Sequence, residues 1–147
     1  MKKGFTLLEL IVVIIILGVL ATLGMSQYFR VVEKSRSSEA KMILGHIRDI
    51  AAGFYTDHQD LSVPVFDSAA AGIGAATNLV PDSCRNSHYF SYQITAQAAS
   101  SFTALATRCV GAGKAPQGPI AGTVQLVTDF AAAAGDQDTF TYDSIYQ

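Results

Sequence analysis

Apolar positions run almost without interruption through the first part of this 147-residue chain. Residues 5–25 contain one charged side chain, that of Glu9, and are otherwise dominated by Leu, Ile and Val. A helix over these residues would be about 31 Å long, which matches a bilayer hydrocarbon core of about 30 Å. Because Lys2 and Lys3 precede the run and most of the chain follows it, we expect the N-terminus in the cytoplasm and the remainder outside the cytoplasmic membrane.

Beyond the apolar run, the hydrophobic spacing stays helical. Apolar residues between 40 and 54 recur every three or four positions, as in a helix that buries one stripe. No proline occurs before Pro64, so we predict a single helix from about 5 to 55, roughly 76 Å long. The polar stretch 30–39 is the expected place for a kink or for fraying. The first half of such a helix must contact lipid or other copies of itself, because the remaining residues are too few to cover it.

The second half of the chain changes to the pattern of strands. Three segments rich in aromatic and β-branched residues are predicted strands, at 89–95, 102–107 and 123–128, and a fourth, at 139–142, is a candidate edge strand. The segments between them are rich in Gly, Pro, Ala and Ser, as expected of loops. We therefore predict an α+β fold, in which a small antiparallel β-meander packs on the C-terminal half of the helix.

Composition and charge restrict the classes of function. Half of the residues are hydrophobic and 15% are charged, which excludes a disordered chain. Ten basic residues against twelve acidic ones form no basic surplus, so we expect no nucleic-acid partner. The sequence contains neither a nucleophile elbow nor a phosphate-binding loop. We expect a protein that is not an enzyme and that uses no cofactor.

The candidate metal ligands lack the spacing of a metal site. His46, His58 and His88 are dispersed along the chain, and solvated or capping roles are expected for them. Asp136 and Asp138 alternate as in a calcium loop, but the twelve-residue ligand pattern is incomplete. We expect no metal, with calcium at these two aspartates as the alternative.

Glu9 is the unusual residue of the apolar run. A carboxylate within a membrane helix costs roughly a few kcal/mol, which suggests a function and a positive partner. Its place near the start of the run would also let it reach the membrane interface. A short basic leader ends in Gly4, and the apolar run begins directly after it with the aromatic Phe5. The stretch Gly4-Phe5-Thr6-Leu7-Leu8-Glu9 resembles the class III signal of type IV pilins and pseudopilins.

This resemblance implies how the N-terminus is processed and used. A membrane prepilin peptidase would cleave between Gly4 and Phe5 and would methylate the new amine of Phe5. Glu9 would pair with that amine on a neighbouring subunit during filament assembly. The chain departs from the family at Ser26, where many members have a proline.

The resemblance also implies the division of the chain and a pilin-like arrangement of its head. The expected segments are a leader peptide at 1–4, a transmembrane and polymerisation helix at 5–29, and a globular head at 30–147. Within the head we expect the helix to continue to about residue 55, with a loop at 56–87 and the β-meander at 88–147.

The function implied is that of a structural subunit of a type IV pilus or a related extracellular filament. The expected partners are copies of itself, the prepilin peptidase, the assembly machinery of the inner membrane, and membrane lipid before assembly. The chain would first be a single-pass inner-membrane precursor and then part of a filament at the cell surface. A pseudopilin of a type II secretion system is the alternative. From a different class, the alternative is a monomeric membrane-anchored periplasmic binding domain.

Cys84 and Cys109 flank the first two predicted strands. Both lie in the part of the chain expected outside the cytoplasm, where a disulfide is the usual state of two cysteines. Closing a loop of about 26 residues would stabilise the head by roughly 3.5 kcal/mol. Two separate buried thiols are the alternative.

Overall fold

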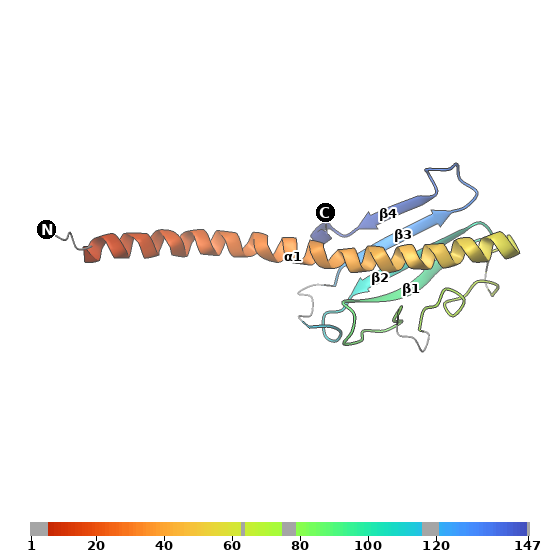
Figure 1. Ribbon diagram of the computed structural model, residues 1–147, viewed down its shortest axis with the longest axis horizontal. Helices are drawn as coiled ribbons and strands as arrows, with labels where there is room; N and C mark the ends of the chain where they lie inside the picture. Colours follow the sequence, from red (N-terminus) through yellow and green to blue (C-terminus); the bar gives the residue numbers. More distant parts are fainter. Residues whose placement is uncertain (1–5, 63, 75–78, 116–120, 147) are drawn as a thin grey trace.

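The computed structural model describes residues 6–62, 64–74, 79–115 and 121–146. A long helix extends well beyond a small head made by its own second half and a sheet (Figure 1). The elements are α1 (Leu7–His58), β1 (Phe90–Gln97), β2 (Ser101–Arg108), β3 (Thr123–Asp129), β4 (Asp138–Tyr142) and the 3-10 helix η1 (Ser144–Tyr146). The predicted α+β fold, with one long N-terminal helix and a β-meander, is confirmed.

Both ends of α1 are capped by recognisable local contacts. At the start, the hydroxyl of Thr6 accepts a hydrogen bond of 3.2 Å from the backbone N–H of Glu9. At the end, Gln59 adopts a left-handed conformation with φ of 55°, and its N–H donates to the carbonyl of Tyr55. The helix therefore ends at His58, about one turn later than the predicted end.

Side chains of the last turn account for this extension. The ring of His58 stacks on that of Phe54 with 4.1 Å between centroids, and its Nδ1 lies 3.1 Å from the carbonyl oxygen of Phe54. The side-chain amide of Gln59 also donates to the carbonyl of Tyr55. These bonds satisfy carbonyls that a helix end otherwise leaves to water.

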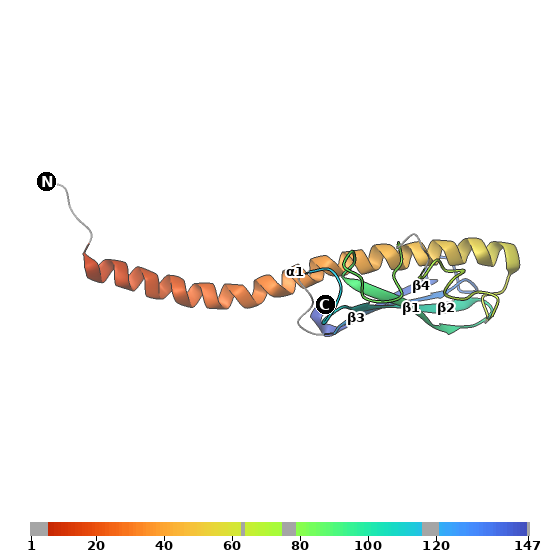
Figure 2. The ribbon, with the colours of Figure 1, turned by 90° about the horizontal axis from the view of Figure 1, so that it is seen from below.

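The polar stretch 30–39, where the sequence predicts a kink, is continuous helix. Glu33 forms an ion pair with Arg36 one turn later, and the hydroxyl of Ser37 donates to the carbonyl of Lys34 at 2.7 Å. Contacts of Glu33 and its neighbours with the head also hold this stretch in place. The helix bows instead in its exposed half, as Figure 2 shows.

The strands form one antiparallel sheet in the order β1-β2-β3-β4. In β2 and β3 every second residue is buried, and Ala104 of β2 lies opposite Leu126 of β3. By contrast, β4 is exposed along nearly its whole length. The hairpin loop between β1 and β2 is three residues long, 98–100, and is shorter than predicted because both strands extend toward it.

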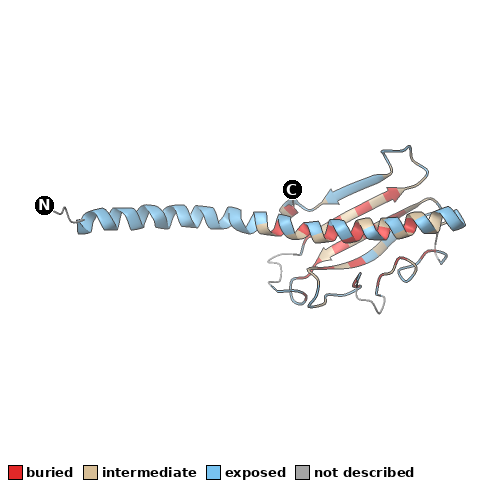
Figure 3. Ribbon diagram, viewed as in Figure 1, coloured by how far each residue is buried: buried red, intermediate tan, exposed pale blue. Residues whose placement is uncertain are grey.

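The core lies between this sheet and the C-terminal half of α1 (Figure 3). The helix contributes one stripe, as its spacing predicts. The buried apolar residues of the stripe are Ala40, Ile43, Leu44, Ile47 and Ala51. Those of the strands are Phe90, Tyr92, Phe102, Ala104, Ala106, Val124 and Leu126. Before Glu33, none of the described helix residues is buried.

The connection between α1 and β1 covers the outer edge of the sheet at β1. The backbone N–H of Tyr92 donates to the carbonyl of Pro81 at 2.8 Å. The side-chain amide of Gln97 donates to the carbonyls of Leu61 and Phe66. Because these groups lie along β1, that edge is occupied by the chain itself.

Candidate functional site

The N-terminal half of α1 is a continuous apolar surface that the head does not cover (Figure 3). Its large hydrophobic side chains are between 44% exposed, at Ile11, and 76% exposed, at Leu7. Among the described residues, α1 is the one helix long and apolar enough to cross a membrane. An uncovered apolar patch of this extent indicates contact with lipid or with other protein.

Glu9 lies in the first turn of this surface and is exposed. It is the third helical residue after the Thr6 N-cap, and its N–H bonds to the Thr6 hydroxyl. Threonine followed three residues later by glutamate is the sequence pattern of a capping box, and a negative charge is favoured at a helix N-terminus. This local role of Glu9 was not predicted above, although the Thr-x-x-Glu spacing was its signal.

The carboxylate of Glu9 can be reached from outside, because no described part of the head approaches this end of α1. Gly4 and Phe5, the residues of the predicted cleavage site, lie outside the described residues. Their cleavage and methylation therefore stay predictions, as does the pairing of Glu9 with the Phe5 amine.

At the other end of the exposed half, a buried ion pair joins α1 to the sheet. The carboxylate of Glu33 accepts hydrogen bonds from Nε and Nη2 of Arg108, at 3.0 and 3.4 Å. Arg36 binds the same carboxylate from the helix. The side chain of Arg108 is 0% exposed, so its charge depends on these partners and on others nearby.

Arg108 is further held by the backbone and by aromatic rings. Its Nη1 donates to the carbonyl oxygens of Tyr89 and Cys109, at 3.0 and 3.3 Å. Its guanidinium carbon lies 5.0 Å from the ring centroid of Tyr89 and 5.7 Å from that of Phe90. Cation–π contact and charge-assisted hydrogen bonds together offset much of the cost of burying the guanidinium.

The environment of Glu33 keeps it ionised. Burial by itself raises the pKa of this carboxyl, but hydrogen bonds and charge from Arg108 and Arg36 outweigh burial and hold the pKa below its ordinary value. This cluster was not predicted from the sequence. Its signal was Arg108, which continues the buried alternation of β2 and therefore needs an inward-facing negative partner.

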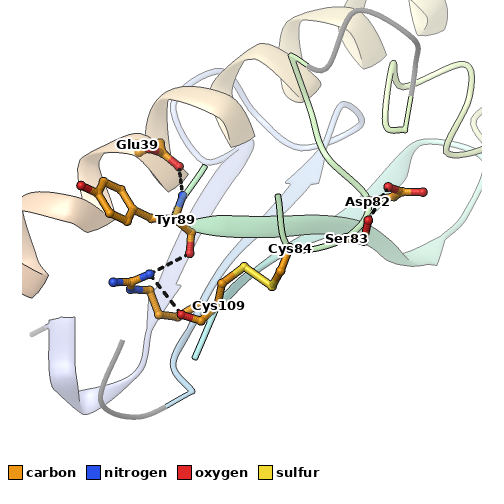
Figure 4. The surroundings of a disulfide bond; sticks show 7 residues. Glu39, Asp82, Ser83, Cys84, Tyr89 and Cys109 are labelled. Carbon is orange, nitrogen blue, oxygen red and sulfur yellow. Dashed lines mark hydrogen bonds between the residues drawn. A yellow bond between two sulfur atoms is a disulfide. The ribbon is translucent and has the colours of Figure 1, made fainter. Parts of the chain in front are cut away.

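A disulfide and a second helix carboxylate fasten the same end of the head (Figure 4). Cys84 and Cys109 are bonded, with 5.7 Å between their Cα atoms, as predicted. The bond ties the segment before β1 to the end of β2. The carboxylate of Glu39 accepts a hydrogen bond of 2.8 Å from the backbone N–H of Tyr89, which fixes α1 to the start of β1.

Of the two aspartates considered for calcium, Asp138 has partners within the head. Asp138 accepts hydrogen bonds from the hydroxyl of Thr128 at 2.8 Å and from Nε of Arg48 at 3.1 Å. In the described part of the chain, no three His, Cys, Asp or Glu residues are grouped to hold a metal ion. His88 is likewise engaged locally, with 2.8 Å between its Nδ1 and the hydroxyl of Ser87.

Comparisons with known proteins agree with the N-terminal pattern. The family model described as "Prokaryotic N-terminal methylation motif" matches residues 1–25. "Fimbrial protein EcpC" of Eikenella corrodens is 40% identical over 77 residues, which cover 52% of this chain and 48% of that protein. "Type IV major pilin protein PilE" of Neisseria gonorrhoeae is 28% identical over 79 residues, covering 54% of this chain and 46% of that protein.

A "Fimbrial protein" of Neisseria meningitidis serogroup B is 27% identical over 101 residues, covering 69% of this chain and 58% of that protein. The chain thus spans about half the length of the curated relatives that it matches first. No solved structure matches it. These relatives are named as fimbrial or pilin proteins and not as enzymes, in agreement with the sequence analysis.

Proposed function

We propose that this chain, whose N-terminal motif and curated relatives are those of type IV pilins, is a structural subunit of a type IV pilus. The observation that carries the proposal is the methylation motif of residues 1–25, which leads into an apolar helix that the head leaves uncovered. Such a helix needs a partner at every stage. Lipid of the cytoplasmic membrane covers it in the precursor, and other copies of the helix cover it in an extracellular filament.

The proposed segments of the chain follow from these two stages, in the membrane and in the filament. Residues 1–4 are a leader that a prepilin peptidase removes, 5–29 cross the membrane and later pack in the filament, and 30–147 form the head. Cleavage between Gly4 and Phe5 exposes an amine at the tip of an apolar helix. N-terminal mass analysis of the exported protein should therefore find a methylated Phe5. An intact Met1 would contradict this step.

Glu9 has a proposed role in setting the register between subunits. In the membrane, both Glu9 and the amine of Phe5 lie near the headgroups and stay hydrated. In a filament of packed helices both charges become buried, where an unpaired charge costs several kcal/mol. Pairing the amine of one subunit with Glu9 of its neighbour offsets much of that cost at one axial offset. Packing of Ile and Val side chains holds the helices together at many offsets and cannot select one.

The capping box at Thr6 makes a sharp test of this role possible. Glutamine at position 9 preserves the capping box and removes the charge, so Glu9→Gln separates the two roles of Glu9. We expect Glu9→Gln and Glu9→Leu to leave the protein cleaved, membrane-inserted and folded, with filaments lost or severely reduced. Glu9→Asp should be intermediate because of its shorter reach. The readout is the amount of the protein in fibres sheared from cells.

Thr6→Ala is the matched control, because it removes the N-cap and leaves the carboxylate in place. If pairing is correct, Thr6→Ala should produce near-normal fibres. Normal fibres from Glu9→Gln would show that residue 9 acts only as a cap. Sheared fractions that lack the wild-type protein, while the membrane contains it, would contradict the pilus assignment itself.

A further inference from the structure

The head follows the membrane-crossing part of α1 without a linker. From Leu7 to Phe29 the helix is about 34 Å long, enough to cross a hydrocarbon core of about 30 Å. Tyr28 and Phe29 are exposed, and aromatic residues favour the interface of a membrane. Glu33, the first buried residue, comes one helical turn after Phe29, which is about 6 Å along the axis. The adjoining end of the head must therefore lie within the headgroup layer.

The acidic side chains of α1 at this level are turned into the protein. Glu33 is enclosed by Arg108 and Arg36, and Glu39 accepts the backbone N–H of Tyr89. Neither carboxylate of these glutamates is presented outward as a free charge. Asp143, just before η1, is exposed at this end of the head, and its carboxylate accepts hydrogen bonds from the backbone N–H and the hydroxyl of Thr123.

The basic side chains at the same level remain outside. Arg30 and Lys34 are exposed on α1, and neither forms an ion pair with a described residue. Lys114, from the connection between β2 and β3, is also exposed, and its Nζ lies 4.8 Å from the ring centroid of Tyr89. The guanidinium carbon of Arg36 on α1 lies 5.1 Å from the centroid of the same ring. Lys114 and Arg36 therefore lie at the same level along the helix.

We propose that Arg30, Lys34 and Lys114 form a binding surface, the neck surface, for anionic phospholipid headgroups of the outer leaflet of the cytoplasmic membrane. The inference rests on the membrane-resident stage of the proposed function. Its partner is identified by charge and depth, since three outward cations lie at the height of the lipid phosphates, where Glu33 and Glu39 are engaged within the head. The neck surface would hold the head at a fixed depth and tilt before the subunit enters a filament.

A single fluorescent reporter can test this proposal in the full-length chain. The sequence contains no tryptophan, so Phe29→Trp places one indole at the outer interface. The protein is inserted into nanodiscs that contain brominated phosphatidylglycerol or brominated phosphatidylcholine at equal mole fractions. Quenching by each lipid measures the relative binding constant of the two headgroups beside residue 29.

Each Lys or Arg close to an anionic surface strengthens attraction about fivefold. We therefore expect a preference for phosphatidylglycerol of about fivefold or more at low salt, with a strong decrease at high salt. Combining Arg30→Gln, Lys34→Gln and Lys114→Gln in the reporter chain should lower the preference to about onefold. The single variants should each lower it in part.

A double variant of Lys41→Gln and Arg48→Gln is the matched control for the double neck variant Arg30→Gln with Lys34→Gln. It removes the same charge from surfaces farther from the neck, and we expect it to keep the preference of the parent chain. Equal quenching by the two lipids in the parent chain would overturn the proposal. An equal loss of preference in the control and the double neck variant would do so too, because it would show a general effect of net charge.

The failure of this proposal can be told apart from failure of the proposed function. Lipid preference is measured on single subunits, and filaments are measured in sheared fractions from cells. A chain that prefers the anionic lipid and forms no filaments contradicts the pilus assignment alone. A chain that forms filaments and shows no lipid preference contradicts the neck surface alone.

Discussion

Replacing Glu33 by alanine should destabilise the head far more than the loss of a surface charge. The side chain of Arg108 is 0% exposed and would lose both bonds to the carboxylate. Breaking a buried ion pair by removing one partner costs about 3–5 kcal/mol. Arg108 keeps the carbonyl acceptors at Tyr89 and Cys109, so we expect the lower end of that range, about 3 kcal/mol. For a domain of this size, that corresponds to a decrease in Tm of about 10–15 °C.

The assay is urea unfolding of the full-length chain in detergent, followed by circular dichroism. Combining Glu33→Leu with Arg108→Met removes both charges, and most of the lost stability should return, because a buried ion pair adds little over well-packed apolar groups. Arg48→Gln, which breaks the partly exposed pair with Asp138, is the control and should cost less than about 1 kcal/mol. If the free energy of unfolding of Glu33→Ala were within about 0.5 kcal/mol of that of the parent chain, the reasoning would be refuted.

The same ion pair predicts a pH dependence. The pKa of Glu33 is lower in the folded head than its ordinary value, so the unfolded chain binds the proton more tightly. Its contribution to stability is complete above the ordinary glutamate pKa and is lost as pH falls through the lower folded value. Glu33→Gln should therefore flatten the acid limb of the stability curve. Unfolding midpoints at a series of pH values measure this, and parallel curves for the two chains would contradict it.

Three further predictions concern the packing of the head, each measured by the same unfolding assay. Reducing the Cys84–Cys109 disulfide should cost roughly 3.5 kcal/mol and leave membrane insertion intact. Gly122→Ala should destabilise, since an added Cβ would overlap the side chains of η1, whereas Gly111→Ala meets nothing within 4 Å and should be neutral. Leu126→Ala should cost about 2–5 kcal/mol, because Leu126 is 1% exposed in the core. Unchanged midpoints for Gly122→Ala or Leu126→Ala would count against the packing described.

Periodicity was a good guide to the fold because the main elements here are long and regular. The helical stripe from Ala40 to Ala51 and the strand alternation of β2 and β3 repeat often enough for hydrophobic spacing to define them. The stretch 30–39, where a kink or fraying was expected, is continuous helix. Its polar side chains Glu33 and Glu39 contact the head, and these contacts stabilise the helix there. Helix propensity reports local preference and cannot include such contacts.

The candidate site was predictable only where its signal is local. Glu9 is conspicuous as a lone acid in an apolar run, and the pairing of two cysteines leaves one intramolecular choice. The Glu33–Arg108 pair joins residues 75 apart along the chain, so it becomes evident only when the register of β2 against α1 is known. The level of Lys114 beside α1 depends on the fold in the same way.

The open edge of the sheet matters for a molecule that is proposed to be packed at high density with its copies. The α1–β1 connection occupies the edge at β1, whereas β4 is the last strand of the described sheet and is exposed. An open edge invites strand-to-strand pairing between chains and amyloid-like aggregation. β4 is only five residues long, and acids stand at its start, Asp138, and just after its end, Asp143. A short edge strand flanked by acids thus disfavours pairing between the sheets of neighbouring heads.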